Sequence, residues 1–239
     1  MDKYENRDVV VKALVGSHNY NLNTANSDED YKYFVAPSFS DLYFGKMFST
    51  AKQTDTVDFD VHDVRQLLNL LWKSNINFME VLFSKKLEYH PDLDWLFLFP
   101  ENYASMNLPA FWNATMGMHK QKMSELFKGT EKTKVLVDTY GYDTKQACHA
   151  LRCLMVLERY TKTKSMEESL WFEDDSYHFS VLMGVKTNNV SLGTFENIVK
   201  AYLPRVEQYK EWYMNQNPNT DLKSNAECLM FDFVKDHLK

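Results

Sequence analysis

Apolar and polar residues follow different periods along this chain, with strand patterns near its start. Residues 9–15 (VVVKALV) are almost all apolar and rich in β-branched side chains, which predicts a buried strand. The segment 30–36 (DYKYFVA) predicts a second strand. Polar and apolar residues alternate over 56–61 (TVDFDV), so this segment predicts a third strand with Asp58 and Asp60 on one face.

From residue 62 onward the period is that of helices. One helical stripe comprises Val64, Leu67, Leu68, Leu71 and Trp72. Another helix is predicted over 77–83, and beyond residue 109 the pattern is helical almost throughout. Mixed strands and helices followed by helices predict an α+β fold, with a first domain over residues 1–100 and a helical domain over 101–239. No stretch between them is typical of a flexible linker, so we expect the two to pack tightly.

Two positions have the spacing of a capping box, in which side chains cap the first turn of a helix. Asp143 and Gln146 precede a segment that is apolar nearly all round, which predicts a buried helix over about residues 143–160. Ser224 and Glu227 have the same spacing before another apolar run and predict a helix start there.

Composition narrows the classes of function. Of the 239 residues, 44% are hydrophobic, which is enough to form a buried core. Charged residues make up 25%, which is ordinary for a soluble protein. A net charge of -6 argues against general coating of nucleic acid, so phosphate contacts require a local basic cluster. Three cysteines without zinc or CxxC spacing are typical of reduced thiols in the cytoplasm. We expect no secretion signal, because the start is charged, and no membrane span, because every apolar run is short.

Asp28 and Asp30 place two like charges side by side. Residues two apart on a strand point to the same side, so their carboxylates repel unless a cation lies between them. Asp60 on the neighbouring strand offers a third carboxylate, and Asp58 is an alternative that the sequence leaves open. Carboxylates that converge from adjacent strands suit Mg²⁺, which keeps waters and substrate phosphates as its other ligands. Two such ions can clamp both oxygens of a phosphoryl transfer, whereas the plain alternative is a pair of surface aspartates.

Two further groups of residues suit an anion. Gly16 and Ser17 end the first strand, where exposed backbone N–H groups form a cradle that a bulky side chain would block. Lys145, His149 and Arg152 lie at i, i+4 and i+7 of the predicted buried helix and form one basic stripe. Buried cations are costly unless they meet anions. The stripe would therefore face a triphosphate or structural carboxylates, and His149 is alternatively a hydrogen-bonded core histidine.

Several ordered segments resemble one family. The pattern hG[GS], nine to thirteen residues, then Dh[DE]h is the signature of the polymerase-beta-like nucleotidyltransferase superfamily, and the chain has VGS, ten residues and DEDY. The branch most similar to the chain is the RNA-repair-pathway polymerase-beta family. The matching segments are GSHNYNL, SDEDYKYFVAP, DFDVHDVRQLL, NFMEVLFS and YGYDTKQACHALR. The resemblance covers most of the chain, fades after about Lys200, and implies a small mixed sheet with flanking helices followed by a mostly helical part that covers the nucleotide.

The resemblance also implies roles for individual residues. Gly16 and Ser17 would contact the triphosphate. Asp28 and Asp30 would bind both metals, and Asp60 would complete the site and help to activate the acceptor hydroxyl.

On the helical side, the residues implied to face the nucleotide are Lys145, His149 and Arg152, with Lys186 a weaker correspondence. The chain departs from the family at two positions. Asn21 stands where the family usually has glycine, so this turn is expected to differ. Glu29 replaces an apolar residue between the aspartates, so it would point to the opposite face and need a partner.

The predicted activity is that of a metal-dependent nucleotidyltransferase (EC 2.7.7-type). It would transfer a nucleoside monophosphate from an NTP such as ATP to a hydroxyl acceptor and release pyrophosphate, with two Mg²⁺ ions or Mn²⁺ in their place. An RNA end, a protein and a small molecule are all candidate acceptors. The alternatives are a non-catalytic nucleotide-binding or antitoxin-like interaction module on the same fold, and a structural helical scaffold.

Overall fold

The computed structural model describes residues 3–53, 57–131 and 133–238 and divides the chain into two compact units. Unit 1 comprises residues 1–107 and 217–239, and unit 2 comprises residues 108–216. The expected α+β class is confirmed, with a sheet in unit 1 and helices alone among the described residues of unit 2. We expected the last segment in the helical domain. In the structure it joins unit 1, because the apolar side of its helix packs there.

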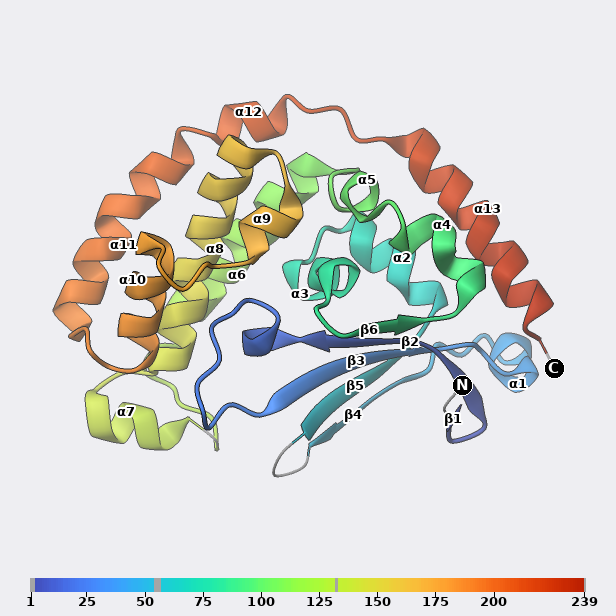
Figure 1. The fold of residues 1–239 in the computed structure, drawn as a ribbon, viewed down its shortest axis with the longest axis horizontal. Helices are drawn as coiled ribbons and strands as arrows, with labels where there is room; N and C mark the ends of the chain where they lie inside the picture. The colour runs from blue at the N-terminus through green and yellow to red at the C-terminus, as the bar shows by residue number, and fades with distance from the viewer. Residues whose placement is uncertain (1–2, 54–56, 132, 239) are drawn as a thin grey trace. The chain divides into compact units, whose positions relative to one another are not determined.

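A mixed sheet forms the base of unit 1 (Figure 1), with strand order β1-β2-β3-β5-β4 and with β6 also paired to β2. The strands are β1 (Lys3–Tyr4), β2 (Arg7–Val15), β3 (Glu29–Val35), β4 (Ser49–Gln53), β5 (Val57–Asp63) and β6 (Leu87–Tyr89). Strand β3 runs parallel to β5, whereas the other pairs are antiparallel.

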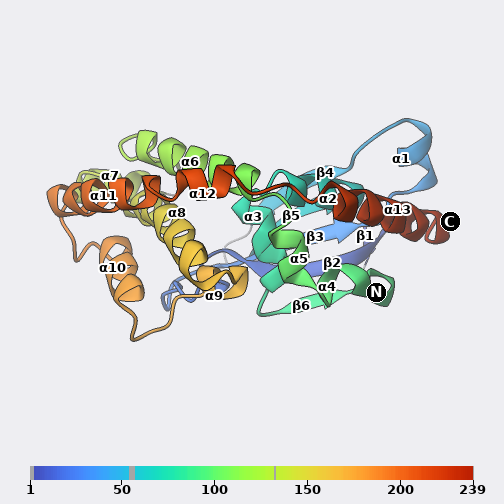
Figure 2. The ribbon, with the colours of Figure 1, turned by 90° about the horizontal axis from the view of Figure 1, so that it is seen from above.

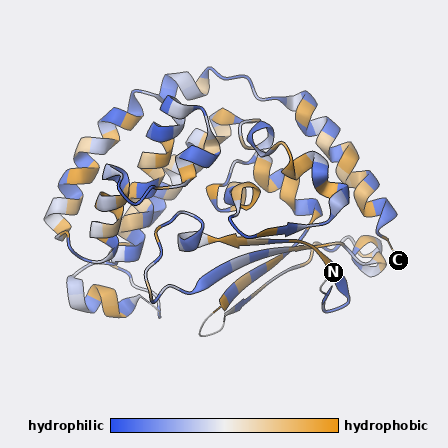
Figure 3. Ribbon diagram, in the orientation of Figure 1, coloured by the Kyte–Doolittle hydropathy of each residue, from blue (hydrophilic) through white to orange (hydrophobic). Residues whose placement is uncertain are grey.

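The three predicted strands are confirmed as β2, β3 and β5, although the predicted first residue of the third, Thr56, lies outside the described residues. Figure 3 shows β2 as a mostly hydrophobic strand. Strands β1, β4 and β6 were not predicted, because they are short and carry no clear alternation.

Most helices of unit 1 lie on one face of the sheet, whereas α1 (Phe39–Tyr43) lies beyond the end of the strands (Figures 1 and 2). The helical elements of unit 1 are η1 (Gly16–His18), α1 (Phe39–Tyr43), α2 (Arg65–Trp72), α3 (Ile76–Met79), η2 (Glu80–Phe83), η3 (Pro91–Leu93), α4 (Asp94–Phe97), α5 (Pro100–Ala104) and α13 (Thr220–Asp236). The predicted stripe of α2 is buried at Leu67, Leu68 and Leu71. On the opposite face of the sheet, a small apolar cluster forms around Val35 and Val61.

The last helix, α13, packs beside α2. Its predicted start at Ser224 is wrong, because the helix begins at Thr220. The Asn219 side chain accepts a hydrogen bond from the Leu222 N–H and caps the first turn, so Ser224 lies within the helix.

Unit 2 is organised around α8. Its helices are α6 (Leu108–Ser124), α7 (Lys134–Tyr140), α8 (Thr144–Thr163), α9 (Met166–Leu170), α10 (Tyr177–Lys186), α11 (Leu192–Glu207) and α12 (Lys210–Met214). The predicted cap is confirmed, because the Asp143 side chain accepts from the Gln146 N–H at 3.0 Å. The predicted burial is also confirmed, with α6, α9, α10 and α11 all in contact with α8. No helix of the described residues has the length and apolar content to cross a membrane.

A buried carboxylate joins α8 to its neighbours. The Glu158 side chain is 1% exposed and forms ion pairs with Lys162 and with Arg205 of α11. His178 of α10 lies 3.8 Å from the same carboxylate. These partners, His178 first, lower the pKa of Glu158 to about 2.

Replacing Glu158 by glutamine is expected to lower the free energy of unfolding by about 3 kcal/mol at neutral pH. The substitution removes the buried carboxylate that pairs with Lys162 and Arg205. The carboxylate stabilises the fold fully above its ordinary pKa of 4.5, and this contribution disappears as pH falls toward 2. Urea unfolding at several pH values should therefore show a flatter acid dependence for E158Q than for the wild type.

The matched control is E196Q, which removes an exposed carboxylate of α11. We expect it to change stability by less than about 0.5 kcal/mol. Equal acid dependence in wild type and E158Q would contradict this account of the pKa.

Candidate functional site

A group of three aspartates, called the acidic group below, lies at the end of the sheet where the strands β3 and β5 begin. The two strands are parallel with Asp30 beside Asp58, and Asp28 immediately precedes β3. Carboxylate oxygens of Asp28, Asp30 and Asp58 all lie within 4.8 Å of one another. At an effective dielectric constant of about 20, two charges at this distance repel by about 3 kcal/mol. The three partly buried side chains therefore form a site suited to a cation.

Asp60 lies one step further along the same face of β5. Its register partner on β3 is Lys32, and the Lys32 Nζ is 3.1 Å from the Asp60 Oδ2. Of the predicted ligands, the structure thus brings Asp28 and Asp30 together with Asp58, while Asp60 forms an ion pair beside them. The alternation that put Asp58 and Asp60 on one face is confirmed by this register.

Lys32 is a residue of the site that we did not identify from the sequence. It is buried, and its ammonium group lies 4.8 Å from the centre of the Phe78 ring of α3. The His62 ring also contacts Phe78, at 5.2 Å between centroids. Burial, followed by the charge of Lys32, lowers the pKa of His62. The period-two series Asp28, Asp30, Lys32 was the available signal, because it places a cation on the face that carries the carboxylates.

Gly16 allows the turn after β2 to approach this group. Its φ of +71° is in the left-handed region, and a Cβ atom there would lie 2.4 Å from the Asp30 Oδ2. The antiparallel register of β2 and β3 places Val15 opposite Asp30, so the turn begins at the same end of the sheet as the acidic group. Ser17 lies in the same short 3-10 turn, η1.

Glu80 holds this turn in place and was also not identified from the sequence. The Gly16 N–H, predicted to face a phosphate, donates to the Glu80 Oε2 at 2.8 Å. The Glu80 carbonyl accepts from the Asn19 side chain at 3.1 Å, and Asn19 in turn accepts from the Lys85 N–H. Glu80 is buried. The signal was a single acidic residue inside the apolar run FMEVLF.

The two departures from the family pattern have structural explanations. Asn21 has a φ of +60°, so it adopts the left-handed conformation that glycine favours and that asparagine tolerates. Glu29 has the partner it was expected to need, because its carboxylate pairs with Lys86 at 2.6 Å and accepts from the Tyr31 hydroxyl. The contact with Lys86 lowers the pKa of Glu29.

Within unit 2, the basic stripe of α8 runs from the surface into the interior. Lys145 is exposed, His149 is partly buried and Arg152 is buried. Burial is the largest cause that lowers the pKa of His149 well below its ordinary value, and the charges of Arg152, Lys122 and Lys186 act in the same direction. Cations from α6, α8 and α10 therefore gather around one imidazole.

The sequence profile of the RNA repair pathway DNA polymerase beta family matches residues 1–171. The chain belongs to this family. The suspected resemblance is thus confirmed, and the matched residues include the acidic group, the Gly16 turn and the stripe of α8. The match to the RNA repair pathway DNA polymerase beta family ends before Lys186, for which only a weak correspondence was expected. No curated protein matches the chain.

Replacing Gly16 by alanine is expected to destabilise the protein by about 1–3 kcal/mol, because the left-handed backbone is strained and the new methyl group meets Asp30. Urea unfolding measures this change. The matched control is G45A, since Gly45 has a φ of +61° and open space around its Cβ position.

The excess of G16A over G45A should disappear in a D30A background, because the clashing carboxylate is then absent. An excess that persists in D30A would contradict the assigned contact.

The depressed pKa of His149 predicts a loss of stability in mild acid. Below the ordinary pKa of 6.5, the unfolded chain takes up a proton that the folded imidazole does not, so stability falls as pH decreases from about 7.5 to 5.5. The variant H149Q should lack this part of the dependence in thermal unfolding. Parallel curves for the two proteins would be inconsistent with a neutral His149.

Proposed function

We propose that the protein is a metal-dependent nucleotidyltransferase that transfers a nucleoside monophosphate from an NTP to a hydroxyl acceptor. The observation that carries this proposal is the gathering of Asp28, Asp30 and Asp58 beside the Gly16 turn. Oxygen donors alone, partly exposed and mutually repulsive, are the donor set that Mg²⁺ or Mn²⁺ binds. Membership of the RNA repair pathway DNA polymerase beta family supports the same class of chemistry.

In this proposal Asp28, Asp30 and Asp58 hold the divalent ions. Bound there, such ions would neutralise phosphate charge and lower the pKa of the acceptor hydroxyl. The three carboxylates would hold the ions at this end of the sheet. Lys32 stays paired with Asp60 and keeps the Asp60 carboxylate beside the acidic group. In this position the Asp60 carboxylate accepts the proton of an acceptor hydroxyl.

Within unit 1, contact with the triphosphate is assigned in this proposal to the turn at Gly16 and Ser17. The turn at Gly16 and Ser17 offers a side-chain hydroxyl and a backbone without an obstructing side chain. Within unit 2, Lys145 and Arg152 carry positive charge suited to an anion, whereas His149 is neutral until an anion binds beside it. Because a nearby anion favours protonation of an imidazole, an anion bound beside this stripe would add a proton to His149.

The acceptor we propose is an RNA end, as the family description suggests. A protein hydroxyl and a small molecule are the other outcomes of the same assay. We propose the cytoplasm as the compartment, since Cys148, Cys153 and Cys228 are free thiols.

The test measures pyrophosphate release and transfer of label from each α-labelled NTP to RNA, protein or metabolite pools. D28N and D58N are each expected to reduce transfer at least about a hundredfold, because removing even an indirect partner of a metal ligand costs 10–100-fold. D60N should also lose at least about a hundredfold, because Asp60 accepts the hydroxyl proton in this proposal and general-base catalysis contributes about 10²–10⁴-fold.

Thermal unfolding separates these losses from misfolding, because the three substitutions are nearly isosteric and should leave the fold intact. A D60N loss as large as that of D28N, with D58N active, would assign the third ligand to Asp60 instead. A wild-type protein that binds NTP with Mg²⁺ but transfers nothing to any pool would favour the non-catalytic binding module.

A further inference from the structure

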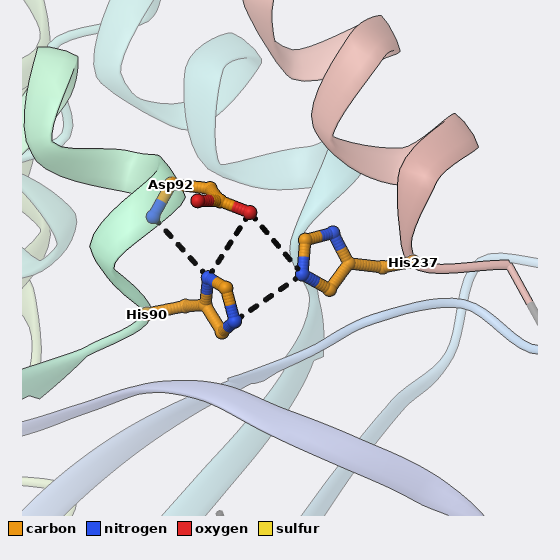
Figure 4. A group of neighbouring side chains, drawn as sticks. All are labelled: His90, Asp92 and His237. Atoms are coloured by element: carbon orange, nitrogen blue, oxygen red, sulfur yellow. Dashed lines mark hydrogen bonds and ion pairs between the residues drawn. The ribbon is translucent and has the colours of Figure 1, made fainter.

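Two histidines and an aspartate lie together in unit 1, separate from the acidic group (Figure 4). His90 and Asp92 belong to the turn that follows β6, and His237 caps the C-terminal end of α13. One possible ligand atom from each of the three residues lies within 4.8 Å of the other two.

The distances among these atoms suit a single small ion. The Asp92 Oδ2 is 3.6 Å from the His90 Nδ1 and 3.6 Å from the His237 Nε2. In a tetrahedral zinc site with donors at about 2.0–2.1 Å, two donors are separated by roughly 3.3 Å. Two of the three separations are thus within a few tenths of an ångström of those in a zinc site, and the third is at most 4.8 Å.

The His237 ring is oriented to offer a lone pair toward the cluster. Its Nδ1 lies 2.7 Å from the Phe233 carbonyl, which only accepts, so the Nδ1 carries the proton. The Nε2 of the neutral ring then carries the lone pair, which faces His90 and Asp92 and lies 3.3 Å from the His90 Nε2 (Figure 4). The His90 Nδ1 accepts from the Asp92 N–H at 3.2 Å, so a bound ion would replace these hydrogen bonds. Hydrogen bonding of the outer imidazole nitrogen to a carbonyl is the usual arrangement around histidine ligands of metals.

Neighbouring aromatic groups hold both imidazoles in position. The His237 ring stacks on Phe233 at 4.2 Å between centroids, and the His90 ring contacts the same phenyl ring edge-on at 5.7 Å. The histidine side chains are 17% and 20% exposed, whereas that of Asp92 is 62% exposed. Solvent therefore reaches the cluster from the Asp92 side, where water can complete a fourth position.

We propose that His90, Asp92 and His237 bind a Zn²⁺-class transition-metal ion. Two imidazoles with one carboxylate favour Zn²⁺, Co²⁺ or Ni²⁺ over Mg²⁺, which prefers oxygen donors alone. The site would join the end of α13 to a turn that lies 147 positions earlier in the chain. Its effect is to stabilise the packing of α13 within unit 1.

The experiment uses the full-length chain carrying D28N and D58N, so that the acidic group does not bind the probe. After removal of metals with EDTA, titration with Co²⁺ should give visible absorption of a tetrahedral complex that saturates at one ion per chain, and Zn²⁺ should displace it. Saturating Zn²⁺ should raise the midpoint of thermal unfolding by roughly 5 °C.

H90Q and H237Q should each abolish the absorption, and D92N should weaken Co²⁺ binding at least about tenfold. The matched control D94N removes an exposed carboxylate two residues away and should bind Co²⁺ as the parent does. Absence of Co²⁺ binding in the parent protein overturns the proposal, whatever the stability of the histidine variants. Binding that survives both H90Q and H237Q overturns it as well.

Discussion

The parallel pairing of β3 with β5 is the constraint on which the candidate site depends. Residues at the same register of a parallel pair stand side by side on one face, so backbone hydrogen bonds hold Asp30 next to Asp58 despite their charges. Because β2 runs antiparallel to β3, the Gly16 turn at the end of β2 lies at the same end of the sheet. Proximity of like charges is thus imposed by the sheet, and the side chains are left with a site that a cation stabilises.

The Gly16 turn lies between two carboxylates with different tasks. Asp30 approaches the α-carbon, which only glycine permits, while the buried Glu80 accepts the backbone N–H. Glu80 thereby joins the end of β2 to η2, and Asn19 extends the same connection to Lys85. The turn is held by hydrogen bonds from a segment more than sixty positions later, so its conformation does not depend on local propensity alone.

Sequence patterns predicted the elements whose signal is local. The apolar run of β2 and the all-round apolar character of α8 require burial wherever they are placed, so both were found. Alternation put Asp58 and Asp60 on one face, but the choice between them depends on register with β3, which no period encodes. Glu80 and Lys32 escaped notice for a related reason, since each acquires its role from a partner on a different element. The start of α13 was misplaced because two possible caps lie a few residues apart.

The return of the chain to unit 1 after Asn217 separates the order of synthesis from the order of folding. The Asn219 N–H donates to the Met106 carbonyl at 2.7 Å, so the outgoing and returning segments meet. Between them the ribosome adds the about 110 residues of unit 2, which takes roughly 5–20 s at common elongation rates. Until α13 is synthesised, the surface of α2 that it later covers stays without this contact. Unit 2, whose residues are contiguous, can fold before unit 1 is complete.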